Sequence, residues 1–124
     1  MGYRTVDASS VDPAPDRPCE LRRLGAAADL EKMAVNRFVA EPGEQLPLAY
    51  HYHDQQEEAF YVLSGTLHVE TPEREFVLDA GELFAVDPGS PQRAFNPESA
   101  DEPAAVLAIG VPPVSGDANP YEGE

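Results

Sequence analysis

The chain has 124 residues, 42% of them hydrophobic, which predicts one folded domain with a buried core and argues against intrinsic disorder. No apolar run approaches the roughly 18 residues of a membrane span, so no membrane segment is expected. The formal net charge of −15 at pH 7 argues against nucleic acid and anionic membrane surfaces as partners.

The excess of acidic residues also bears on the salt concentration in which the protein works. Acidic side chains outnumber basic ones by 23 to 8, and such an excess destabilises a compact chain through self-repulsion. Because salt screens this repulsion, the composition predicts a halophilic origin, in a salt-rich cytoplasm. A cytoplasmic location also fits an N-terminus without an apolar signal segment and a single cysteine, Cys19, which is expected to be a packing or edge residue.

The two ends of the chain differ in composition from its middle. Residues 1–18 are rich in proline and predict an irregular N-terminal arm. Residues 112–124 predict a polar C-terminal tail. The folded domain is therefore expected over residues 19–111.

Within this domain, short β-like runs alternate with turn signals such as Ser64-Gly65 and Pro88-Gly89. Only residues 25–32 resemble a helix, over barely two turns. Many short strands at regular spacing predict an all-β sandwich, jelly roll or barrel. The predicted strands cover residues 20–24, 33–40, 48–53, 59–63, 66–70, 75–78, 83–86, 93–95 and 104–110.

Two of the three histidines stand at alternate positions, in His51-Tyr52-His53. In an extended strand such side chains point to the same face, about 6–7 Å apart along the chain. The loop that follows can bring the Glu58 carboxylate back beside them. Two neutral imidazoles and a carboxylate are a ligand set for a divalent transition metal. The alternative is a strand that carries two solvated histidines.

The pattern Gly43, His51-x-His53, Glu58 and Gly65 resembles the first sequence motif of the cupin superfamily. In that motif a glycine precedes two alternate histidines, a glutamate follows them, and a second glycine closes the hairpin. The resemblance extends over residues 33–111. It implies a small single-domain cupin, with the double-stranded β-helix (a jelly-roll barrel) as its fold and a homodimer as its common assembly.

The second cupin motif is also present, in a weaker form. Gly81, Gly89 and Asn96 stand at the expected places, with Asp87 where a proline is usual. Gln92 occupies the position at which the family carries a fourth metal ligand, a histidine. This substitution weakens the metal prediction, because a glutamine oxygen is a neutral and weaker donor than an imidazole nitrogen.

The resemblance thus implies a divalent metal, iron, manganese, nickel or zinc, held by His51, His53 and Glu58, with Gln92 as a weak fourth ligand. The alternative is a barrel whose metal site has decayed and in which Gln92 is a hydrogen-bonding pocket residue.

Strand alternation also predicts which side chains face the same interior as the ligands. By the same alternation His68 belongs to a polar surface. The predicted substrate pocket, which includes Phe84 although its face is ambiguous, consists of Ala49, Phe60, Val62, Phe84 and Ala94.

Three functions are compatible with such a pocket. The first is a metal-dependent enzyme acting on a small organic molecule, with dioxygenation, isomerisation and decarboxylation among the reactions that the family performs. The second is a non-catalytic module that binds or senses a small molecule, and the third is a structural barrel without a ligand. The sequence does not choose the reaction.

Overall fold

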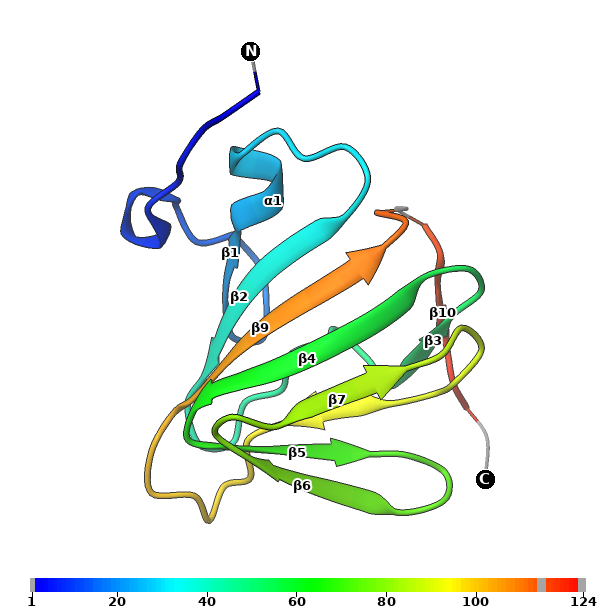
Figure 1. The fold of residues 1–124 in the computed structure, drawn as a ribbon. Coiled ribbons are helices and arrows are strands. Elements are labelled where there is room, and N and C mark those ends of the chain that lie inside the picture. The colour runs from blue at the N-terminus through cyan, green and yellow to red at the C-terminus, as the bar shows by residue number, and fades with distance from the viewer. Residues whose placement is uncertain (1, 114–115, 123–124) are drawn as a thin grey trace.

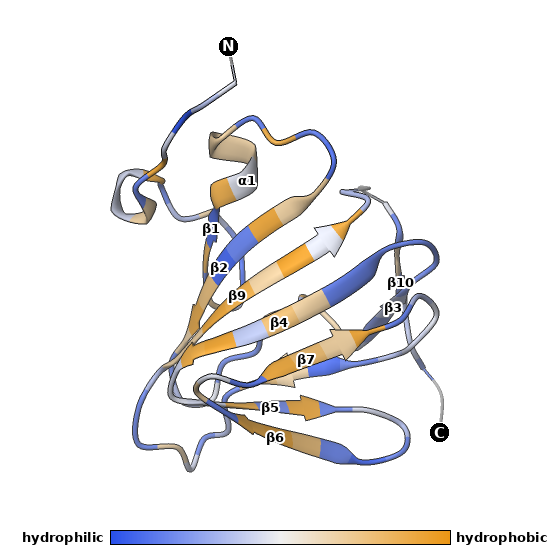
Figure 2. Cartoon of the chain, in the orientation of Figure 1, coloured by the Kyte–Doolittle hydropathy of each residue, from blue (hydrophilic) through white to orange (hydrophobic). Residues whose placement is uncertain are grey.

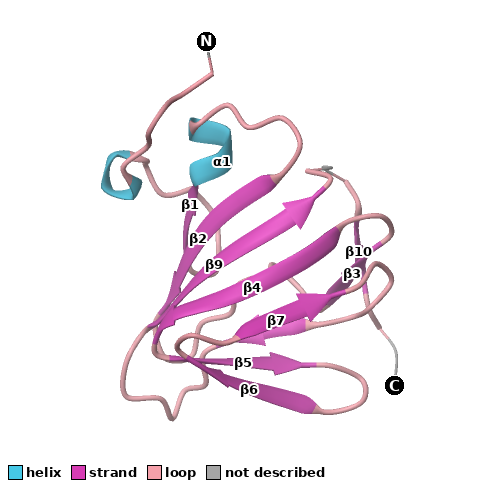
Figure 3. Ribbon diagram, viewed as in Figure 1, coloured by secondary structure: helices cyan, strands magenta, loops and turns pink. Residues whose placement is uncertain are grey.

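The structure is a computed structural model, and it describes residues 2–113 and 116–122. Strands dominate, and the helical turns lie near the N-terminal end (Figure 3). No helix in these described ranges is long and apolar enough to cross a membrane. In chain order the elements are η1 (Ala8–Ser10), β1 (Glu20–Arg23), α1 (Leu24–Ala27), β2 (Ala34–Ala40), β3 (His51–His53), β4 (Glu57–Ser64), β5 (Thr66–Glu70), β6 (Glu75–Asp79), β7 (Leu83–Val86), β8 (Arg93–Phe95), β9 (Ala104–Val111) and β10 (Ala118–Pro120).

The strands form antiparallel sheets that curve around a common interior (Figure 1). One sheet has five strands in the order β1-β2-β9-β4-β7, and a second has three in the order β6-β5-β8. A separate pair, β10-β3, lies beside them. Strands that follow one another in the sequence, such as β4 and β5, belong to different sheets, and this connectivity is typical of a jelly roll. The predicted all-β, double-stranded β-helix is therefore confirmed.

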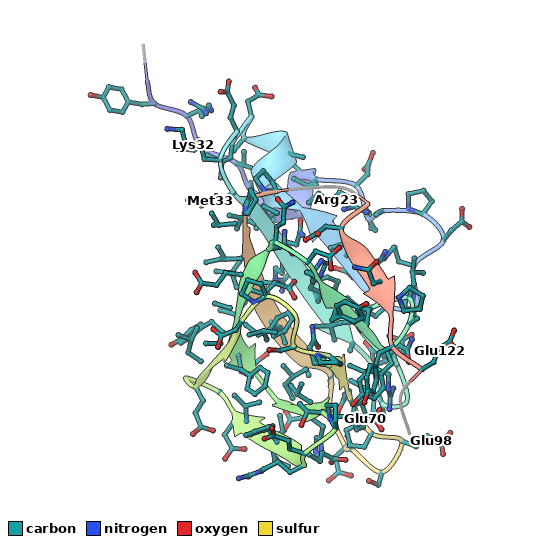
Figure 4. All side chains as sticks on the ribbon, turned by 90° about the vertical axis from the view of Figure 1, so that its right-hand side faces the viewer. Arg23, Lys32, Met33, Glu70, Glu98 and Glu122 are labelled. Atoms are coloured by element: carbon teal, nitrogen blue, oxygen red, sulfur yellow. The ribbon has the colours of Figure 1, made fainter. Side chains whose placement is uncertain are left out.

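Hydrophobic side chains fill the interior. Along the strands hydrophobic residues are interspersed with hydrophilic ones (Figure 2), which lets one face of a strand turn inward. In β5, for example, Leu67 and Val69 are fully buried while His68 lies on the other face, paired with Glu75 at 2.8 Å. Each fully buried leucine or valine contributes roughly 1.5–3 kcal/mol to folding. Acidic side chains such as Glu98 and Glu122 lie at the periphery instead (Figure 4).

All nine predicted strands are present, with ends that differ by a few residues. The largest difference is at residues 48–50, which bend and leave only His51–His53 as strand β3. The predicted helix is reduced to the four residues of α1.

Both chain ends pack more closely than the sequence analysis expected. In the segment taken as a tail, β10 pairs with β3, and Tyr121 packs against Tyr50 with ring centroids 5.0 Å apart. In the segment taken as an arm, the Ala14 N–H donates to the Leu21 carbonyl at 2.8 Å. These contacts join residues far apart in the sequence, so local patterns do not reveal them.

We expect Gly65 to tolerate no side chain. Its φ is +75°, and a Cβ there would lie 2.2 Å from the Pro103 carbonyl oxygen, so backbone strain and a steric clash coincide. Gly65→Ala should lower the free energy of unfolding by more than about 2 kcal/mol in urea denaturation. Gly81→Ala is the matched control, because Gly81 has a φ of +91° but open space around it. It should cost only about 1 kcal/mol, and equal losses would contradict the steric argument.

Candidate functional site

Strands β3 and β4 bring the two histidines and Glu58 together. The alternation along β3 turns both imidazoles to one side, and the connection through residues 54–56 returns the chain beside them. One ligand atom from each of His51, His53 and Glu58 lies within 4.8 Å of the others. The imidazole rings are edge to face with centroids 4.9 Å apart, and His53 Nε2 lies 3.5 Å from Glu58 Oε1. This is the ligand set that the sequence predicted for a metal.

Glu58 is held largely out of water. Burial raises the pKa of its carboxyl to about 7, although the hydrogen bond from Gln92 opposes this shift. The neighbouring Glu57 is exposed, as the alternation predicted. Within the described part of the chain no charged group offsets the burial of this carboxylate, and a bound cation would do so.

His51 is oriented by its own backbone neighbourhood. Its Nδ1 lies 2.9 Å from the Ala49 carbonyl oxygen, and a proton on Nδ1 leaves the lone pair of Nε2 free for a ligand. Burial lowers the pKa of His51, which favours the neutral imidazole that metal binding needs.

Gln92 lies beside the three ligands, as the second motif predicted. Its backbone forms an antiparallel bridge with His51, with N···O distances of 2.9 and 3.2 Å. The Gly89 N–H, in the preceding turn, donates to the His53 carbonyl at 2.6 Å. The Gln92 side chain donates through Nε2 to Glu58 Oε1 at 3.3 Å, whereas its buried Oε1 has no hydrogen-bond partner among the described residues. An unpaired, buried acceptor oxygen next to three ligand atoms fits a cation site.

Asp117 is a site residue that the sequence analysis missed. It precedes β10 and is only 9% exposed, and its carboxylate accepts backbone N–H groups of residues 54, 55 and 56 at 3.0–3.1 Å. Desolvation would raise the pKa of Asp117, but these hydrogen bonds, with a smaller contribution from His53, outweigh it and lower the pKa. Its Oδ2 lies 3.7 Å from His53 Nδ1, a buried nitrogen without a hydrogen-bond partner in the described part of the chain.

The contact places a carboxylate behind His53, on the side of the ring away from Glu58. Metal-bound histidines usually donate their second ring N–H to such a group, which fixes the tautomer. No local sequence pattern indicates that Asp117 belongs to the site, because 61 residues separate it from Gln56 in the loop that it caps.

The ligand set opens into a cavity of about 360 Å³. Apolar side chains such as Phe38, Leu46, Phe60 and Ile109 make up much of its wall. A mostly apolar wall with a few convergent polar groups is typical of small-molecule sites.

Three of the predicted pocket residues, Ala49, Phe60 and Ala94, line this cavity. Val62 and Phe84 do not. Val62 is fully buried in the core two residues further along β4 than Phe60, and Phe84 packs against Phe76 with ring centroids 5.1 Å apart. Alternation predicts the face of a strand but not how far along the barrel the cavity extends.

Two further polar residues of the wall come from the chain ends: Arg17 from the predicted arm and Asn119 from β10. Their only sequence signal is their type, since nothing local indicates that these segments fold back over the cavity.

Comparisons with known proteins agree with this architecture. Residues 36–110 match the cupin domain family model. The chain is 33% identical over 95 residues to the polyketide synthase CurC of Streptomyces cyaneus, a match that covers 70% of this chain and spans 58% of the length of that protein.

Solved structures share the fold. A sugar phosphate isomerase of the cupin superfamily from Silicibacter pomeroyi is 26% identical, with a TM-score of 0.76 over 87% of this chain and 75% of that one. The polyketide cyclase RemF of Streptomyces resistomycificus is 17% identical, with a TM-score of 0.80 over 99% of this chain and 88% of that one. Because the family model covers more than half of the sequence, the chain belongs to the cupin domain family.

Proposed function

We propose that this protein binds a divalent metal ion through His51, His53 and Glu58 and acts with it on a small, largely apolar organic molecule held in the adjoining cavity. The observation that carries this proposal is the convergence of three ligand atoms within 4.8 Å at the wall of that cavity. The unpaired Gln92 oxygen supports a neutral fourth donor.

A bound metal of this kind supplies a Lewis acid that polarises a carbonyl oxygen. Two neutral imidazoles and one carboxylate leave such a centre with a net positive charge, which favours an electron-rich oxygen of the organic molecule. The Ala49 carbonyl and Asp117 would hold the two histidine rings in the orientation for binding. The apolar wall limits water around the reacting group and so strengthens electrostatic interactions there.

A carbonyl-rich molecule with an apolar skeleton fits this cavity better than a sugar phosphate. Most of the wall surface is apolar, so several hydroxyls of a sugar would lack partners there. The similarity to a polyketide synthase, at 33% identity, supports the same substrate class. Besides Arg17, the titratable side chains among the described lining residues are the three proposed ligands. A reaction driven by carbonyl polarisation therefore fits better than one that needs a separate general base.

Metal analysis of the purified protein tests the metal proposal directly. After incubation with zinc, nickel, manganese or iron(II) and removal of the excess, wild type should retain about one ion per chain with at least one of these metals, and His51→Ala should retain little. His68→Ala is the matched control, because His68 is paired with Glu75 outside the ligand group. Gln92→His should raise the affinity, since imidazole is the stronger donor. Equally low metal content in wild type and His51→Ala would refute the metal proposal.

The buried carboxyl predicts a pH dependence of the metal-free protein. Because the folded-state pKa of Glu58 is raised from 4.5 to about 7, the folded state binds the proton more tightly than the unfolded state does. Glu58 therefore costs stability as the pH rises from 4.5 through 7, on the order of 3 kcal/mol. In urea denaturation with a chelator, Glu58→Gln should exceed wild type in stability at pH 8 but not at pH 4.5. The exposed Glu57→Gln should show no such gain, and an equal gain in both variants would argue against the burial effect.

Asp117→Asn should weaken metal binding by roughly 10- to 100-fold, because the group behind His53 Nδ1 loses its charge. Competition with a chelating dye measures the affinity, and nitrogen NMR of the His53 ring reports whether its tautomer shifts. Asp101→Asn, at an exposed aspartate, provides the control with the same charge change. Unchanged affinity and an unchanged tautomer in Asp117→Asn would show that Asp117 only caps the loop.

A further inference from the structure

We propose that the cavity selects a molecule that carries one anionic oxygen group, a carboxylate or a phenolate, and that Arg17 binds this group. The inference rests on the proposed role of the cavity as a small-molecule site, and it adds the chemical class of the ligand and the residue that recognises it.

The guanidinium of Arg17 lines the cavity and is only partly satisfied. Its Nη2 donates to the Leu46 carbonyl oxygen at 3.1 Å, which anchors the side chain against the wall. Its Nε is buried and has no hydrogen-bond partner among the described residues. Among the described residues the guanidinium makes only the hydrogen bond to Leu46, so it keeps N–H groups that can donate to an anionic oxygen in the cavity.

The position of Arg17 is set by the chain that surrounds it. Cys19, two residues later, is buried in the core, and β1 begins at Glu20. On the other side Ala14 hydrogen-bonds to Leu21 and packs against the core. The predicted arm is therefore folded back here, and Arg17 is held at the cavity wall.

The charge pattern makes this residue distinctive. Arg17 is the only lysine or arginine among the described residues that line the cavity, in a chain whose net charge is −15. The overall field repels anions, so an anionic ligand needs a local positive group. A guanidinium matches the two oxygens of a carboxylate.

The rest of the wall limits the ligand to an apolar skeleton. Phe38, Leu46 and Phe60 provide apolar contacts, while Asn36 and Asn119 are neutral donors and acceptors. A single guanidinium leaves one charge of a phosphate dianion without a partner, and the hydroxyls of a sugar would lack partners on the apolar side. An aromatic or aliphatic carboxylate, or a phenolate, would pair its charge with Arg17 and place its apolar skeleton against the apolar walls.

Titration calorimetry on the full chain, kept metal-free with a chelator so that no carboxylate can bind a metal, tests the inference. The probes are 2-naphthoate, its neutral analogue 2-naphthamide of similar shape, and ribose 5-phosphate. Wild type should bind 2-naphthoate at least about tenfold more tightly than 2-naphthamide. Arg17→Gln should remove this preference by weakening 2-naphthoate alone, and Arg17→Lys should retain part of it.

The matched control is Arg74→Gln, which removes the same charge from an exposed side chain in the turn between β5 and β6, outside the cavity. It should change the affinity for 2-naphthoate by less than about twofold. Equal binding of 2-naphthoate and 2-naphthamide to wild type, no binding of 2-naphthoate at millimolar concentration, or tighter binding of ribose 5-phosphate would overturn the inference, whatever the folding of the variants. Metal content is measured in a separate experiment. If only the metal proposal fails, the protein will retain no metal but will still prefer 2-naphthoate over 2-naphthamide.

Discussion

The candidate site depends on one constraint, a carboxylate kept away from water. Glu58 lies on an inward face of β4, and burial raises its pKa to about 7, so the metal-free barrel carries an electrostatic cost at this position. The neighbouring groups offset that cost only in part. Gln92 donates one hydrogen bond to the carboxylate, but burial lowers the pKa of both histidines and so favours their neutral form, which carries no compensating charge. Such a centre is poorly balanced without a cation and well balanced with one, which is why its chemistry points to a metal.

The two chain ends complete the site. The interior of the barrel supplies the candidate metal ligands and the apolar walls, whereas Arg17 and Asp117 come from the segments before β1 and after β9. Asp117 caps the loop between β3 and β4 and reaches towards His53, and β10 fixes it there by pairing with β3. Peripheral segments thus add polar groups to a cavity whose wall is mostly apolar.

Sequence patterns predicted this fold well because alternation and turn chemistry are local. The strands of the barrel and the inward face of Glu58 follow from which side chains alternate, and Gly65 follows from a turn that needs a positive φ. Val62, predicted from the same alternation, and Phe84, whose face was ambiguous, do not line the cavity. They share the inward face but lie at a depth where side chains fill the barrel, and depth depends on how the sheets close.

By itself, the sequence determined the fold class and predicted the candidate ligand residues on β3 and β4 and the place of Gln92 beside them, since each depends on short-range spacing. Only the tertiary structure decided which residues surround those ligands. Asp117 meets a loop 61 residues away, and Arg17 donates to a carbonyl 29 residues further along the chain. Contacts at such separations are created by sheet pairing and core packing, which no local spacing encodes, so the character of the cavity emerged only once the chain had closed around it.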